Sequence, residues 1–133
     1  EVKRDSEESS NLEKKPVFAQ TIHKMTDYIP TVSKADVERI IERDYLGHSG
    51  EAIWAILREY GKGEAYRIYA AALKMGGGSL GALTSAVELA KLDYRDLLVA
   101  AEYPNQARLG LSASASPQVI ETDWTQYKDW FNK

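Results

Sequence analysis

Hydrophobic residues recur every three or four positions along most of the chain, and a capping residue stands before each such run. The clearest start is Ser33, which with Asp36 predicts an acidic version of the capping box, a pair of reciprocal side-chain to backbone hydrogen bonds. The helix that follows carries its apolar residues on one face: Val37, Ile40, Ile41 and Tyr45. Gly47 and Gly50 then bracket a short turn.

Two more helices follow the same pattern. Ser49 is expected to cap a helix whose apolar face consists of Ile53, Ile56, Leu57 and Tyr60. Gly61 stands where a left-handed residue would end it. The next helix is predicted over about 63–75, with a buried stripe of Ala65, Ile68, Ala72 and Leu73. Three alanines at 70–72 favour a helix and permit the close approach of a neighbour, and the glycines at 76–78 end it.

Capping residues also mark the later helices. Ser79 is expected to cap a helix that buries Leu80, Leu83, Val87 and Ala90. Asp93, followed by Asp96 at capping-box spacing, is expected to cap another helix, which buries Leu97, Leu98 and Ala101. Pro104 stops that helix, because a proline pushes the preceding residue out of helical geometry. Residues 105–116 are therefore predicted to form a loop.

The two ends of the chain differ in character. Residues 1–15 are polar and mixed in charge, which predicts a flexible arm. Pro16 is expected to open a helix with an apolar side of Val17, Phe18, Ile22 and Met25. At the other end, Ser116 and Pro117 form a cap and first turn. The helix predicted over 117–131 is aromatic, with an apolar stripe of Ile120, Trp124, Tyr127 and Phe131 and with Trp130 close by.

The predicted fold class is all-α, because no stretch of useful length alternates like a strand. We expect a compact bundle of six to seven short helices joined by Gly, Ser and Pro turns, in a single domain over 16–133. A net charge of −3 argues against general nucleic-acid binding, which needs a basic face. The absence of cysteine excludes disulfides, thiolate zinc sites and cysteine nucleophiles. No apolar run approaches the ~20 residues of a membrane span, so we expect a cytoplasmic protein without membrane contact.

One glycine-rich turn formally matches a nucleotide-binding pattern. Residues 76–81 read G-G-G-S-L-G, but helical residues precede them where the dinucleotide fold needs a strand. A turn between helices with glycines at positive φ is the simpler interpretation. An alternative stays open, in which free amides at the start of the next helix hold an anion near Lys74. The candidate ligand-binding residues for this alternative are Tyr66, Arg67, Tyr69, Gly78 and Ser79.

Recognised catalytic and metal-binding motifs are missing from the sequence. His23 and His48 have no second ligand at metal-binding spacing, so we expect no metal site and no cofactor. Two carboxylates can share acid and base roles, and four acidic residues cluster here: Glu88, Asp93, Asp96 and Glu102. Capping is the simpler role for the aspartates, together with a polar network between helices formed by Tyr94, Arg95 and Asp96. No catalytic residue is assigned, and a non-enzymatic role is favoured.

The part of the chain that carries a resemblance is 71–104. It contains Ala-Ala-Leu-Lys at 71–74, a glycine-bearing turn, Glu-x-Ala-Lys-x-Asp-Tyr-Arg-Asp at 88–96 and Ala-Glu-Tyr-Pro at 101–104. This pattern resembles a group of small uncharacterised bacterial helical proteins, and the tail with Trp124 and Tyr127 is similar to the same group. The resemblance implies a bacterial, cytoplasmic, all-helical protein and transfers no catalytic residues.

Aromatic residues are numerous, and tyrosine and tryptophan suit both core edges and interfaces. The best candidate for a partner surface is the C-terminal helix with Trp124, Tyr127 and Trp130, which could dock on its own domain or on a partner. The leading hypothesis is a non-enzymatic protein-interaction module, for instance an immunity- or antitoxin-type protein that occludes a toxin. A homodimer and a monomer are expected equally. The runner-up function is a domain that binds small molecules or anions at the turn 76–81.

Overall fold

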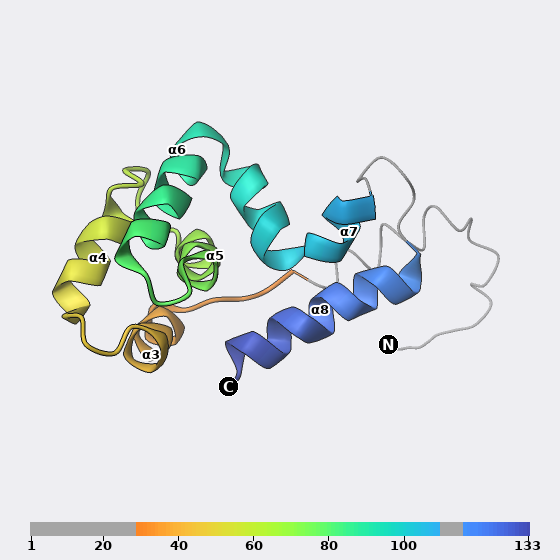
Figure 1. Cartoon of the computed structure of the whole chain (residues 1–133), viewed down its shortest axis with the longest axis horizontal. Coiled ribbons are helices and arrows are strands. Elements are labelled where there is room, and N and C mark those ends of the chain that lie inside the picture. The colour runs from red at the N-terminus through yellow and green to blue at the C-terminus, as the bar shows by residue number, and fades with distance from the viewer. Residues whose placement is uncertain (1–28, 110–115) are drawn as a thin grey trace.

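The computed structural model describes residues 29–109 and 116–133, and these residues form six helices and no strand. The helices are α3 (Lys34–Asp44), α4 (Gly50–Arg58), α5 (Tyr66–Gly76), α6 (Leu80–Glu102), α7 (Pro104–Leu109) and α8 (Pro117–Phe131) (Figure 1). The all-α prediction is confirmed. The predicted arm over 1–15 and the helix expected from Pro16 lie outside the described residues.

The predicted N-terminal caps are present. The amide of Asp36 donates to Ser33 Oγ over 3.1 Å, and the amide of Ser33 donates to Asp36 Oδ2 over 2.9 Å, which completes the capping box of α3. Each of the other three predicted serine caps accepts a hydrogen bond from the backbone amide three residues on: Ser49, Ser79 and Ser116. The starts of four helices therefore follow from local hydrogen bonding that the sequence specifies.

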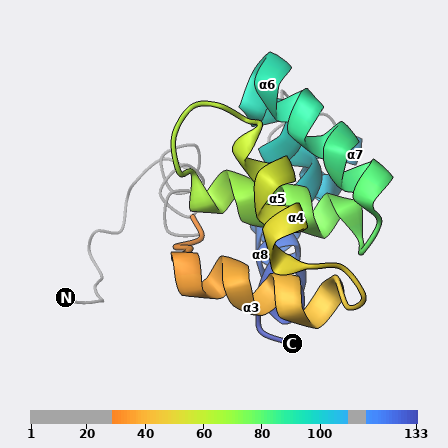
Figure 2. The same ribbon diagram turned by 90° about the vertical axis from the view of Figure 1, so that its left-hand side faces the viewer.

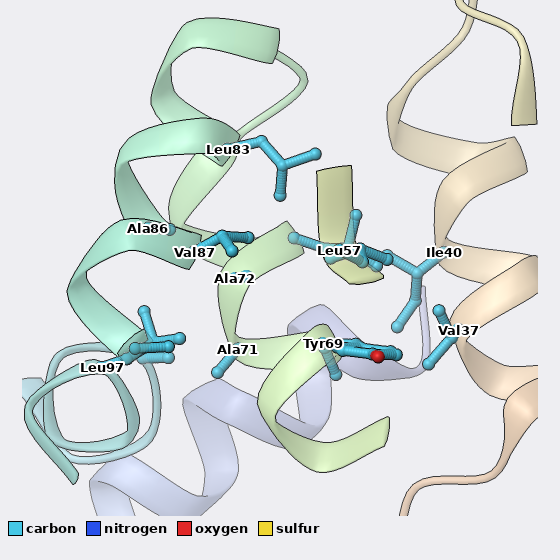
Figure 3. Close-up of a cluster of buried hydrophobic side chains, with 14 of the residues drawn as sticks. Val37, Ile40, Leu57, Tyr69, Ala71, Ala72, Leu83, Ala86, Val87 and Leu97 are labelled. Carbon is cyan, nitrogen blue, oxygen red and sulfur yellow. The ribbon is translucent and has the colours of Figure 1, made fainter. Parts of the chain in front are cut away.

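Helix α5 lies at the centre of the core, where it packs against α6 and α3 (Figures 1 and 2). Side chains from α3, α4 and α6 converge on it around Tyr69 (Figure 3). The three alanines at 70–72 are at most 1% exposed. Their small side chains let the neighbouring helices approach the α5 backbone closely, as the sequence predicts.

The predicted outline of α5 needs two corrections. The helix begins at Tyr66 rather than near 63, because Gly63 has a φ of +84° and lies in a left-handed turn before it. The buried face is also wider than the predicted stripe, since Tyr69 and the alanines at 70–71 are buried whereas Ala65 and Ile68 are only partly covered. A helix enclosed by neighbours on several sides buries more than one stripe.

The glycine-rich turn between α5 and α6 owes its composition to packing and backbone conformation. A Cβ on Gly76 would overlap the hydroxyl of Tyr45 and lie 3.1 Å from Leu83 Cα. Gly77 has a φ of +56° and closes α5 through its amide, which donates to the Leu73 carbonyl over 3.2 Å. Gly78 has a φ of +92°. The interpretation of this run as a helix–helix turn is confirmed.

Helix α6 is bent at Asp93, whose φ of −159° and ψ of 104° are extended. Its Oδ1 accepts the amide of Arg95 over 3.0 Å, so Asp93 caps the second half of the helix as expected. The reciprocal hydrogen bond expected from Asp96 is not formed. The guanidinium of Arg95 contacts both carboxylate oxygens of Asp93 instead, each over 3.0 Å.

The loop predicted over 105–116 is wrong in its first part, because Pro104–Leu109 is the short helix α7. Proline ends α6 but is also favoured in the first turn of a helix. The new helix gains its cap from α8, a contact that no local sequence pattern reveals. The remaining part, 110–115, lies outside the described residues.

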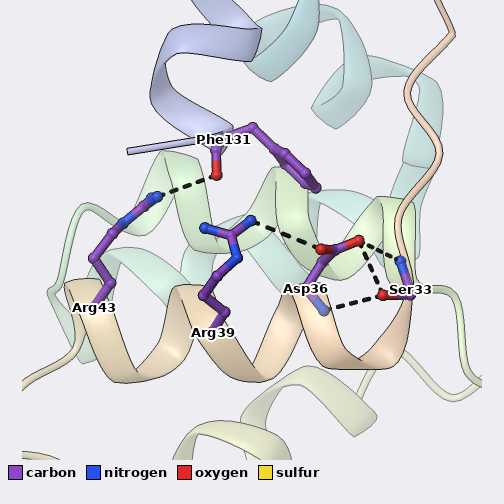
Figure 4. A network of polar contacts seen from close by, with 5 residues as sticks. All are labelled: Ser33, Asp36, Arg39, Arg43 and Phe131. Carbon is purple, nitrogen blue, oxygen red and sulfur yellow. Dashed lines mark hydrogen bonds and ion pairs between the residues drawn. The ribbon is translucent and has the colours of Figure 1, made fainter.

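Helix α8 docks on its own chain with its C-terminal end against α3 (Figure 4). Nη1 of Arg43 donates to the carbonyl of Phe131 over 3.2 Å, and the Arg43 guanidinium lies 5.3 Å from the Trp130 ring centroid. Arg39 lies over the Phe131 ring at 5.2 Å and faces Asp36 at 3.8 Å. Cation–π contacts and a helix C-terminus beside a cation both favour this docking.

We predict that Gly76→Ala destabilises the fold by about 1–3 kcal/mol, because the new Cβ must displace the Tyr45 hydroxyl and the backbone at Leu83. Gly50→Ala is the matched control, since a Cβ there meets nothing within 4 Å. Urea denaturation measures both free energies of unfolding. Equal values for the two variants would contradict the close approach at Gly76.

Candidate functional site

A partly buried ion pair joins α5 to the end of α6. Arg67 donates from Nε to Glu102 Oε2 over 2.9 Å and from Nη2 to Oε1 over 2.6 Å, and Glu102 is only 3% exposed. Nη2 also reaches the Tyr103 hydroxyl at 3.3 Å. The hydrogen bonds to Glu102 raise the pKa of Arg67, because they favour its charged form. Arg67, a predicted ligand-binding residue, is therefore engaged by its own chain.

A second buried carboxylate holds α7 against α8. Asp123 is 2% exposed and accepts four hydrogen bonds of 2.8–3.1 Å from the backbone and side-chain nitrogens of Asn105 and Gln106. These residues form the first turn of α7, where free amides and the helix dipole favour an anion. Asp123 is not among the candidate residues predicted from the sequence. Its signal is a charged residue on the apolar stripe of α8, three residues after Ile120 and four before Tyr127.

Lys74 is engaged in the same region. Its Nζ donates to the Ala101 carbonyl over 2.8 Å, and burial lowers the pKa of the Lys74 ammonium. The cluster formed by Arg67, Lys74, Glu102 and Asp123, here named the polar junction, thus contains two positive and two negative groups. Balanced charges with several hydrogen bonds are the arrangement in which buried ionised groups are tolerated. The hydrogen bonds of the polar junction join α5 to the end of α6 and α7 to α8.

The structure does not bring the proposed anion-binding residues together. Tyr66 and Tyr69 lie at the start of α5, whereas the glycine turn follows its end, ten residues or about 15 Å along the helix axis. Tyr69 is 2% exposed, donates its hydroxyl to the Gly63 carbonyl over 3.1 Å and packs edge-on against Trp54. Ser79 Oγ accepts the Ala82 amide, as a helix cap does. These contacts explain the residues without a ligand.

The bend of α6 carries the most exposed apolar side chain among the described residues. Leu92 is 86% exposed and Tyr94 is 44% exposed, and the bend lies at the edge of the molecule (Figure 1). Arg95 pairs with Asp93 on its own helix, so the polar network expected between helices is a local contact instead. Asp96 is exposed beside them. Hydrogen bonds from Arg95 lower the pKa of Asp93, because they favour its ionised form.

Of the four aromatic residues of α8, one is buried and three are partly buried. Tyr127 is 2% exposed, and its ring centroid lies 6.5 Å from that of Trp124, 5.5 Å from Trp130 and 5.9 Å from Phe131. Burial raises the pKa of the Tyr127 hydroxyl. Tyr127 is thus a core residue rather than a partner contact. Trp124 and Trp130 are partly buried at the edge of the core.

Comparisons with models of protein families, with curated proteins and with solved structures found no match to this chain. Within the described ranges, no group of three or more His, Asp or Glu side chains is placed to hold a metal ion. His48 is exposed, and His23 lies outside those ranges. None of the described helices combines the length and apolar character needed to cross a membrane.

We predict that Asp123→Asn lowers the free energy of unfolding by about 1–3 kcal/mol. The asparagine NH2 group would replace one carboxylate oxygen, so it could not accept from the nitrogens of Asn105 or Gln106 that this oxygen now binds. Asp129→Asn is the control, since Asp129 lies on the exposed face of the same helix. Thermal and urea unfolding of both variants measure the difference. A loss no larger than that of Asp129→Asn would show that Asp123 does not hold α7.

Proposed function

We propose that this chain is a protein-binding module and that the bend of α6 is its contact surface. The observation that carries the proposal is the exposure of Leu92 and Tyr94, which flank Asp93 at the bend. A single exposed leucine is ordinary on a protein surface. Tyrosine and arginine, which follow at 94–95, are residue types enriched at the centre of interfaces. Leu92 adds an exposed apolar side chain beside them in the sequence.

The bend is held in shape before any partner arrives. Asp93 adopts the extended conformation that opens the helix, and Arg95 contacts its carboxylate with two guanidinium nitrogens. Behind the bend, Leu97 and Leu98 anchor the second half of α6 in the core. A preformed contact surface loses little conformational entropy on binding, which favours affinity.

The charges around the bend suggest the chemistry of the partner. Lys91 pairs with Glu88 at 3.1 Å and Arg95 pairs with Asp93 at 3.0 Å, which leaves Asp96 as the remaining charge. A partner that fits this surface has an apolar pocket for the Leu92 side chain. The residues around that pocket are polar or weakly basic, to match the negative charge of Asp96. Because the paired charges largely cancel, the affinity is expected to depend little on salt concentration.

The proposed biological setting follows from the resemblance of 71–104 to small bacterial helical proteins. In this setting the protein is cytoplasmic and of immunity or antitoxin type, and it blocks a toxin by covering it. The acidic balance and the all-helical fold are compatible with this role. A second copy of the chain is the other partner that the same surface accommodates.

We predict that Leu92→Asp lowers the affinity for the partner roughly ten- to hundred-fold, because burying a leucine contributes about 1.5–3 kcal/mol. Leu46→Asp is the matched control, since Leu46 is 81% exposed in the turn before α4. The full chain and both variants are immobilised and exposed to a bacterial lysate, and retained proteins are quantified by mass spectrometry. Light scattering of the same three proteins tests self-association.

A protein retained by the wild type and by Leu46→Asp but lost with Leu92→Asp identifies the partner. If instead the wild type is a dimer and Leu92→Asp is a monomer with unchanged circular dichroism, the partner is a second copy. Identical retention and identical molar mass for all three proteins would contradict the proposed surface.

A further inference from the structure

The hydroxyl of Tyr127 is a buried polar group without a hydrogen bond among the residues that the structure describes. No other buried side-chain nitrogen or oxygen in the described ranges lacks a partner. Buried polar groups in proteins are almost always paired with protein or with ordered water, so this hydroxyl requires an explanation.

A small cavity lies beside Tyr127, under α8. Apolar walls come from Pro30, Ile120 and Trp124, and polar walls come from Glu102, Tyr103 and Gln106. The space open to the centre of a water-sized sphere is about 10 Å³. One water molecule needs roughly 10–15 Å³ by this measure, so the cavity is at the lower size limit for one water and excludes larger ligands.

The polar walls retain hydrogen-bonding capacity. The Tyr103 hydroxyl accepts from Arg67 and is also hydrogen-bonded to the Glu102 carboxylate, which leaves a lone pair on its oxygen as an acceptor. The Gln106 amide donates from Nε2 to Asp123 Oδ2 over 3.1 Å, which leaves its oxygen as an acceptor. Glu102 contributes carboxylate lone pairs. A buried water typically makes two to four hydrogen bonds, and the groups lining this cavity can supply them.

We propose that the cavity is a binding site for one internal water molecule, which bridges the Tyr127 hydroxyl to the carboxylate end of the polar junction. The bridge connects α8 to the end of α6 through Glu102 and Tyr103. It complements the direct contacts of Asp123, which join α8 to α7. The water is thus a structural part of the docking of α8, and the proposal is independent of any partner of the protein.

Water oxygen-17 magnetic relaxation dispersion, which counts water molecules held for longer than nanoseconds, tests the proposal on the full chain. We expect Tyr127→Phe to hold one long-lived water fewer than the wild type. Tyr45→Phe is the matched control, because the Tyr45 hydroxyl already donates to the Leu73 carbonyl over 2.9 Å. The control is expected to hold the same number of waters as the wild type.

Equal counts for the wild type and Tyr127→Phe would overturn the proposal, and a higher melting temperature of Tyr127→Phe would then identify the hydroxyl as a dry, unpaired group. If Tyr127→Phe does not fold, a high-resolution crystal structure of the wild type shows whether a water occupies the cavity. A water peak within about 3.2 Å of Tyr127 Oη supports the site. A cavity without such a peak overturns it.

Discussion

The close approach of three helices at Gly76 is the constraint on which the rest of the fold depends. Here the Tyr45 hydroxyl from α3 reaches the Leu73 carbonyl of α5 over 2.9 Å, while Leu83 of α6 packs against the same turn. Only glycine leaves room for both neighbours. The alanines of α5 continue this close packing along the helix. The core therefore consists of close contacts between helix backbones as well as contacts between large side chains.

The second half of the molecule is assembled on polar contacts. Arg67 and Glu102 fix the end of α6 on α5, and Asp123 caps α7 from α8. Buried charges of this kind contribute less to net stability than to specifying one arrangement of the helices, a role that is best attested where they set register. The cation–π contacts of Arg39 and Arg43 then place the C-terminal end of α8 on α3.

Most of the candidate binding residues already have partners within the chain. The aromatic residues of α8, the arginine of α5 and the glycine turn are each explained by packing or by hydrogen bonds within the chain. The bend of α6 differs, because an exposed leucine and tyrosine there contribute little to the folded core. This exposed bend is therefore the surface that we propose for recognition of another protein.

The sequence by itself determined the helices and most of their boundaries, because serine and aspartate caps, glycine ends and apolar stripes act within a few residues of one another. It placed Ser33, Asp93 and Ser116 correctly for that reason. Only the tertiary structure decided that Tyr69 and Tyr127 are core, that Arg67 pairs with Glu102 and that Asp123 caps α7, because these contacts join residues that are distant in sequence. The exposure of Leu92 was decided in the same way, since the direction in which a bent helix projects a side chain depends on what its neighbours leave uncovered.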